Sequence, residues 1–336
     1  MINFSSKEYL PNSEERLAHL RKIINGRPVA ILAAGPSIHE LEERIEQLRQ
    51  ADICYFGINK FFVQETHILQ KINKQMSVVS CGGREGMPEI ISPVIDFFNR
   101  DEDNMFISSF WRDPFGLVNN FNLRQFLDRY DKKLLFFSID KRGAVPNNNY
   151  PLHFIESNSL LMQIQMALIG QAQSIVLFGA DGHGGEGSKK CYYRHDEYAI
   201  PGWSWINESL MNDTRHFFNS IAATAIKNTC KTYNLPLINI LNCSPKSFYT
   251  PFPKISYDEA FEYLLTGKKL IGRLDLRVPL KPKTPHVCSL ILERALSFLR
   301  RHRWNSLAVI TVRCADQLMK ILKNQRDDKA NYARSS

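Results

Sequence analysis

Short apolar runs alternate along the chain with longer segments in which apolar residues recur every three or four positions. The runs have the length of buried strands, and the longer segments have the spacing of amphipathic helices. Strands are expected at residues 29–34, 52–59, 76–80, 133–138, 174–179 and 237–241. Helices are expected at residues 12–26, 39–50, 159–170 and 212–233. This alternation predicts an α/β fold with a mostly parallel sheet and helices on both faces.

Glycine and small polar residues gather directly after the expected strands. They are Gly35 to Ser37, Asn59, Ser80 to Gly83, Gly179 to Asp181 and Asn242 to Ser244. Ligands of parallel α/β sheets bind outside the carboxyl ends of the strands, where the strand order switches, so these ends predict one shared site. The alternative is that strand-to-helix turns use these residue types for backbone geometry alone.

The turn after the first expected strand reads Ala33-Ala34-Gly35-Pro36-Ser37. Gly35 allows a tight turn and a close approach to a ligand, Pro36 suits a first helical turn, and Ser37 adds a hydroxyl beside free helix N–H groups. The turn is not a GxGxxG dinucleotide fingerprint, because Ala33, Pro36 and Ile38 do not fit it. It is not a P-loop, because no GK[ST] follows. It predicts a nucleotide phosphate site; the alternative is an ordinary helix cap.

Composition narrows the class of protein. Hydrophobic residues make up 44% and charged residues 23% of the 336 positions, which excludes collagen, a coiled coil and a largely disordered chain. We expect no membrane-spanning helix and no secretory signal. The seven cysteines are scattered and never form CxxC, so they are interpreted as reduced thiols of a cytoplasmic protein.

The positive charge is concentrated in residues 268–336, which hold 16 of the 43 Lys and Arg residues and five of the 34 acidic ones. We expect residues 1–27 to form an N-terminal helix, residues 28–255 the sheet domain, and residues 256–336 a basic helical C-terminal extension. Cations beside Trp304 and leucines suit an anionic membrane surface at the inner face of the membrane. A helical hairpin packed on the body or on another copy is preferred to this, because Leu-rich helices usually lie in a core. A solvated tail is the third alternative. Nucleic acid is not expected, because no RNA-binding motif is present.

A set of motifs in order resembles a known domain. It comprises AAGPS after the first strand, INK after the second, the helix from Ser159, LFGADG and the NCSP ending. From Pro28 to Pro253 the chain resembles the domain shared by motility-associated flagellin glycosyltransferases and archaeal 6-hydroxymethylpterin pyrophosphokinases. That domain is similar in turn to bacterial lipooligosaccharide sialyltransferases. The resemblance implies that a Pro-rich loop after this ending leads into a helix.

The sialyltransferases imply a Rossmann-like fold that uses a CMP-activated sugar and no metal. Carried over by position, their nucleotide contacts fall on the GPS turn, on Asn59 and on Ser159 beside Asn158. The expected nucleotide-binding residues are therefore Gly35, Pro36, Ser37, Asn59, Ser80, Gly82, Asn158, Ser159, Gly179 and Asp181. Three positions depart from the pattern: Ala34 replaces an expected Asn, Glu156 an Arg, and His183 a phosphate-contacting Tyr.

Transfer of a sugar requires a base for the acceptor hydroxyl and donors for the departing phosphate. The resemblance places the general base close to His216, which lies beside Arg215 and Asp213; the alternative is a surface or capping His. The residues expected to donate hydrogen bonds to the departing phosphate are His183, Tyr192 and Tyr193. They lie in the Gly-rich stretch 182–205, which we expect to be a lid over the bound donor or, alternatively, a plain surface loop.

These observations predict a glycosyltransferase that transfers a CMP-activated nonulosonic or sialic-type acid to a cell-surface glycan, glycolipid or protein. No metal or cofactor is expected for this reaction. One alternative is an ATP pyrophosphokinase of the hydroxymethylpterin type, in which Asp181 would bind Mg²⁺ through the donor phosphates. Another is a non-catalytic nucleotide-binding scaffold. A homo-oligomer is compatible with each of these functions.

Overall fold

The computed structural model describes residues 13–33, 35–58, 61, 66–80, 95–100, 103–108, 133–136, 138–139, 153–154, 159–182, 218–219 and 221–267. The chain divides into two compact units, residues 1–280 and residues 281–336. Every described residue belongs to the first unit. The helices expected in the C-terminal extension beyond residue 267 lie outside the described residues, and the boundary expected at residue 255 stays a prediction.

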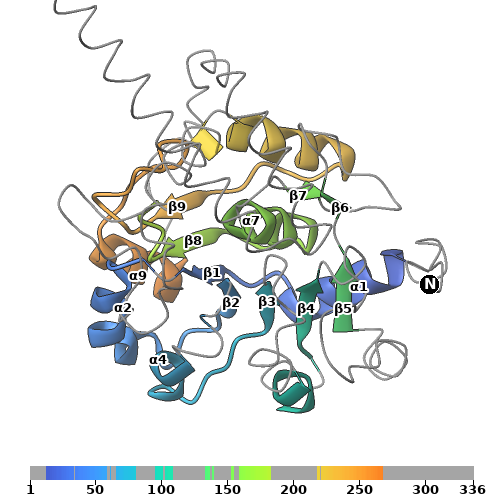
Figure 1. The fold of residues 1–336 in the computed structure, drawn as a ribbon. Helices are drawn as coiled ribbons and strands as arrows, with labels where there is room; N and C mark the ends of the chain where they lie inside the picture. The colour runs from blue at the N-terminus through green and yellow to red at the C-terminus, as the bar shows by residue number, and fades with distance from the viewer. Residues whose placement is uncertain are drawn as a thin grey trace, which may run out of the picture. The chain divides into compact units, whose positions relative to one another are not determined.

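The described residues form a seven-stranded parallel sheet in the order β5-β4-β3-β2-β1-β8-β9 (Figure 1). Its strands are β1 (Val29–Leu32), β2 (Cys54–Ile58), β3 (Val78–Ser80), β4 (Met105–Ser108), β5 (Leu134–Phe136), β8 (Ile175–Phe178) and β9 (Ile240–Asn242). A separate parallel pair joins β6 (Ser138–Ile139) to β7 (His153–Phe154). The predicted α/β class with a parallel, Rossmann-like sheet is confirmed.

The strand order switches at β1. Strands β2 to β5 lie on one side of it in chain order, whereas the later strands β8 and β9 lie on the other side. Leu32 at the end of β1 pairs with Gly57 of β2 and with Phe178 of β8, so three carboxyl ends lie level. Sheets of this kind bind ligands at such a switch point.

The helices are α1 (Ser13–Ile24), α2 (Ile38–Arg44), the 3₁₀ turn η1 (Ile45–Leu48), α4 (Thr66–Gln70), α7 (Ser159–Ile169) and α9 (Tyr257–Thr266). Alternate residues of β1 face opposite sides of the sheet, as strand geometry requires. Val29 and Ile31 pack in one core with α1 and α7, while Ala30 and Leu32 pack in a second core with α2, α4 and α9. The sheet is therefore covered on both faces.

Differences from the expected elements are small in the centre of the sheet. Strand β4 was not predicted, and the last strand begins at Ile240 rather than at residue 237. The helix expected after the Pro-rich loop is present as α9, while the long helix expected at 212–233 is described at 218–219 and 221–232. Within the described part of the chain, no helix combines the length and apolarity that a bilayer crossing requires.

Candidate functional site

The turns that follow β1 and β8 are joined beyond the ends of the strands. The Ala33 N–H donates to the Phe178 carbonyl and the Gly35 N–H to the Gly179 carbonyl, each at 2.9 Å. Gly179 has a φ of +65°, and a Cβ there would overlap the Ala33 carbonyl. A Cβ at Gly35 would overlap the Gly179 carbonyl and the Asp181 carboxylate. Both positions therefore require glycine; the sequence predicted a tight turn for Gly35, whose close approach in the structure is to the Gly179 carbonyl and Asp181.

Ser37 is held by three hydrogen bonds from the second half of the chain. Its N–H donates to Asp181 Oδ2 at 2.8 Å, and its Oγ lies 2.7 Å from Ser244 Oγ. Its carbonyl accepts from the Tyr257 hydroxyl at 2.8 Å. Ser37 does not cap α2 through its side chain, so the alternative of an ordinary side-chain cap is not what the structure has; the hydroxyl bonds Ser244 Oγ instead. The Asp181 carboxylate takes an amide that was expected to face a phosphate.

The end of β9 supports the Gly179–Asp181 segment. Asn242 donates from Nδ2 to the Ala180 carbonyl at 3.3 Å, and Ser247 Oγ donates to the same carbonyl at 2.6 Å. Asn242 Oδ1 accepts from the Ser244 N–H at 3.0 Å. These side chains are buried, so they fix backbone and leave Asp181 and Ser37 at the edge of the site.

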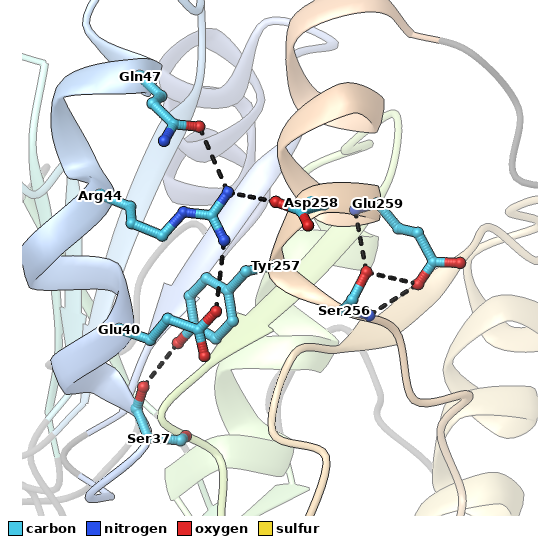
Figure 2. Close-up of polar contacts among 8 residues, drawn as sticks. All are labelled: Ser37, Glu40, Arg44, Gln47, Ser256, Tyr257, Asp258 and Glu259. Atoms are coloured by element: carbon cyan, nitrogen blue, oxygen red, sulfur yellow. Dashed lines mark hydrogen bonds and ion pairs between the residues drawn. The ribbon is translucent and has the colours of Figure 1, made fainter.

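Helix α9 contacts both the turn and α2, through Tyr257 and Asp258 (Figure 2). The Arg44 guanidinium of α2 pairs with Asp258 and lies 4.9 Å from the centre of the Phe261 ring. It also bonds Glu40 and Gln47 of its own helix region. Burial raises the pKa of the Tyr257 phenol, so the hydroxyl stays protonated and donates to Ser37 at all moderate pH values.

A second polar group lies at the ends of β2 and β3. Gln163 of α7 is fully buried, and its Nε2 donates to the Gly57 carbonyl and to Ser80 Oγ, each at 2.9 Å. Ser80 is the last residue of β3 and is also fully buried. Ser159, one helical turn before Gln163, begins α7. Because α7 ends five residues before β8 starts, its amino end lies at the carboxyl edge of the sheet.

The structure thus brings several predicted site residues together. Gly35, Pro36, Ser37, Gly179 and Asp181 form one cluster, and Ser80 and Ser159 adjoin the amino end of α7. The other predicted residues lie outside the described residues: Asn59, Gly82, Asn158, His183, Tyr192, Tyr193 and His216. Their roles stay predictions.

Several residues that support the site were not among the predicted site residues, and they include Gln163, Ser244 and Tyr257. A signal for Gln163 was present, because a polar residue in the apolar helix 159–169 needs an internal partner. Ser244 belongs to a strand end that the pattern did identify. No local signal marks Tyr257, whose contact with Ser37 spans 220 residues of sequence.

Two chemical functions find no support in the described residues. Burial raises the pKa of the Cys243 thiol well above its ordinary value, which disfavours a thiolate nucleophile near the site. The part of the chain that the structure describes also contains no cluster of three His, Cys, Asp or Glu residues able to hold a metal ion.

Comparison of the chain with family models, curated proteins and solved structures yields no match.

Proposed function

We propose that the protein is a glycosyltransferase that binds a nucleotide-sugar donor at the carboxyl edge of its sheet. The observation that carries the proposal is the cluster of Gly35, Ser37, Gly179 and Asp181 at the point where the strand order switches. This is the place where open parallel sheets bind nucleotides. The resemblance to sialyltransferases adds the expectation of a CMP-activated nonulosonic or sialic-type acid.

In the proposed reaction His216 accepts the proton of the acceptor hydroxyl. The hydroxyl oxygen forms a bond to the anomeric carbon, and the bond from that carbon to the CMP phosphate breaks. His183, Tyr192 and Tyr193 donate hydrogen bonds to the departing phosphate, and CMP leaves with the electron pair. The acceptor would be a cell-surface glycan, glycolipid or protein.

One observation favours a second candidate, an ATP pyrophosphokinase. The Asp181 carboxylate bonds the Ser37 amide, so a phosphate at this turn would meet a negative charge. A divalent cation between the carboxylate and the phosphates would offset that repulsion. This candidate requires Mg²⁺, whereas the sialyltransferase-like reaction does not.

Thermal unfolding of the full chain with CMP, UDP, GDP and ATP, each with and without Mg²⁺, separates the candidates. A ligand that binds the native state raises the melting temperature by mass action. Stabilisation by CMP without metal supports the glycosyltransferase, and stabilisation by ATP only with Mg²⁺ supports the pyrophosphokinase. No shift with any nucleotide overturns both and leaves a scaffold protein that binds none of these nucleotides.

The base is tested by release of CMP from CMP-N-acetylneuraminic acid. We expect His216→Ala to lower turnover by about 10²–10⁴-fold and to leave CMP binding unchanged. His39→Ala, on the exposed side of α2, is the matched control and should retain full turnover. Full activity of His216→Ala would show that another group is the base.

We further propose that the protein is cytoplasmic and that the basic segment 268–336 binds an anionic membrane surface, which would bring the enzyme to a lipid-linked acceptor. Co-sedimentation with phosphatidylserine vesicles, compared with phosphatidylcholine vesicles, tests the membrane contact. Equal recovery with both lipids, or none, would favour a packing role for the segment.

A further inference from the structure

The buried amide of Gln163 joins two strand ends and has a fixed orientation. Both of its N–H groups are donated, one to the Gly57 carbonyl and one to Ser80 Oγ. Rotating the amide by half a turn would place Oε1 against the Gly57 carbonyl, two acceptors facing each other. The amide nitrogen therefore faces the strands, and Oε1 faces the other way.

One hydrogen-bond acceptor and one donor remain without a described partner beside the ends of β2 and β3. Gln163 Oε1 is buried and has no hydrogen-bond partner within the described part of the chain. Ser80 Oγ accepts from Gln163, and its own proton has no acceptor among the residues that the structure describes. Leaving a buried acceptor unpaired is costly. Other buried atoms of the described residues also have no partner, but Gln163 Oε1 is the one carried by a side chain that bonds the ends of two strands.

The position of the pair matches the extent of a nucleoside bound from the first turn. Ser80 pairs with Ile58 at the end of β2, and β2 in turn adjoins β1. Neighbouring strands lie about 4.8 Å apart, so the end of β3 lies roughly 10 Å from the end of β1 along the edge. A phosphate near Gly35 would place the attached nucleoside within reach of Gln163.

We propose that Gln163 and Ser80 are a specificity-determining pair that recognises a nucleobase with an amine beside a ring nitrogen. The acceptor Oε1 would receive the exocyclic amine, and the Ser80 hydroxyl would donate to the ring nitrogen, as cytosine and adenine allow. Both side chains are neutral and fully buried, which suits an uncharged group and disfavours an ion. The inference rests on the proposed nucleotide-binding function and adds the residues that recognise the base.

The test is calorimetric binding of CMP and UMP to the full chain, because uracil has a carbonyl where cytosine has the amine. Wild type should prefer CMP, and Gln163→Met should lose about tenfold in CMP affinity while UMP affinity stays nearly constant. Methionine keeps the volume and burial of the side chain. Ser80→Ala is a smaller change and should also lower the ratio of CMP affinity to UMP affinity. It serves as the second variant where Gln163→Met folds poorly.

Gln165→Met is the matched control, because Gln165 is as buried on the same helix and makes no described contact with a strand end. It should leave the CMP to UMP ratio unchanged. A purely structural role of Gln163 would lower both affinities equally and would overturn the inference, as would a wild type that binds both nucleotides alike. A wild type that binds no nucleotide would overturn the proposed function and this inference together.

Discussion

The turn after β1 and the ends of β2 and β3 differ in how their polar groups are used. At the turn, the amide, the hydroxyl and the carbonyl of Ser37 are all engaged by other parts of the chain. At the strand ends, Gln163 uses only its amide nitrogen, and its Oε1 has no partner among the described residues. The hydrogen bonds of Ser37 are complete without a ligand, whereas Gln163 Oε1 would need a ligand as its hydrogen-bond partner.

From this difference we infer that the two regions have different roles at one edge of the sheet, the turn in positioning a ligand and the strand ends in selecting it. A turn held by Asp181, Ser244 and Tyr257 keeps its shape and so positions a ligand at little entropic cost. In the proposed nucleotide site, the buried pair Gln163 and Ser80 would discriminate between ligands, because a mismatched ligand would leave them unpaired. Substitutions at and around the turn test its rigidity, and the binding of CMP and UMP tests the selectivity of Gln163 and Ser80.

The largest effect is expected from Gly179→Ala. The change adds a Cβ at a φ of +65° and also drives it into the Ala33 carbonyl, so we expect a loss of more than about 3 kcal/mol in unfolding free energy. Gly267→Ala is the control, because its φ is +66° but nothing lies within 4 Å of the added atom. That control should cost about 1 kcal/mol.

Urea unfolding of the two variants measures the difference between them. If both glycine substitutions cost the same, the close approach of the two turns is not part of the native structure. The preorganisation of the first turn would then lose its main support.

A smaller effect is expected from Tyr257→Phe. The variant removes the hydroxyl that donates to the Ser37 carbonyl and should lower the unfolding free energy by about 1–2 kcal/mol. Tyr55→Phe is the control, since the buried Tyr55 hydroxyl has no partner within the described residues. Removing that hydroxyl should be neutral or slightly stabilising.

Tyr257→Phe should also weaken nucleotide binding severalfold, because the turn loses one of its three supports. A variant that loses stability but binds CMP like wild type would separate the stability of the turn from its role in binding. Thermal unfolding with increasing CMP gives both quantities from one sample.

The sequence predicted the strands and the turn that form the site better than the hydrogen bonds that hold the turn in place. Apolar runs such as 29–34 and 174–179 mark buried strands locally, and glycine after a strand marks a tight turn, so the central strands and Gly35 were found. The bonds from Asp181, Ser244 and Tyr257 to Ser37 span 144, 207 and 220 residues of sequence. Such pairings depend on the strand order, which periodicity does not give. Strand β4 was not predicted although its four residues equal β1 in length, so length alone does not explain the omission.

The smallest effect concerns the cap of α9, which carries Tyr257 to the turn. Ser256 and Glu259 form a capping box: Glu259 Oε2 accepts from the Ser256 N–H at 2.7 Å, and Ser256 Oγ accepts from the Glu259 N–H at 3.2 Å (Figure 2). The bonds from Ser256 lower the pKa of the Glu259 carboxyl.

A lowered pKa in the folded state means that the carboxylate stabilises the protein above the ordinary value near 4.5 and loses this contribution as the pH falls through the folded value. Glu259→Gln should therefore flatten the pH dependence of unfolding free energy on the acid side of that value. If α9 supports the turn as the comparison requires, Glu259→Gln will also weaken CMP binding slightly, and less than Tyr257→Phe does. A stronger effect on binding than that of Tyr257→Phe would place the link between α9 and the turn elsewhere than at Ser37.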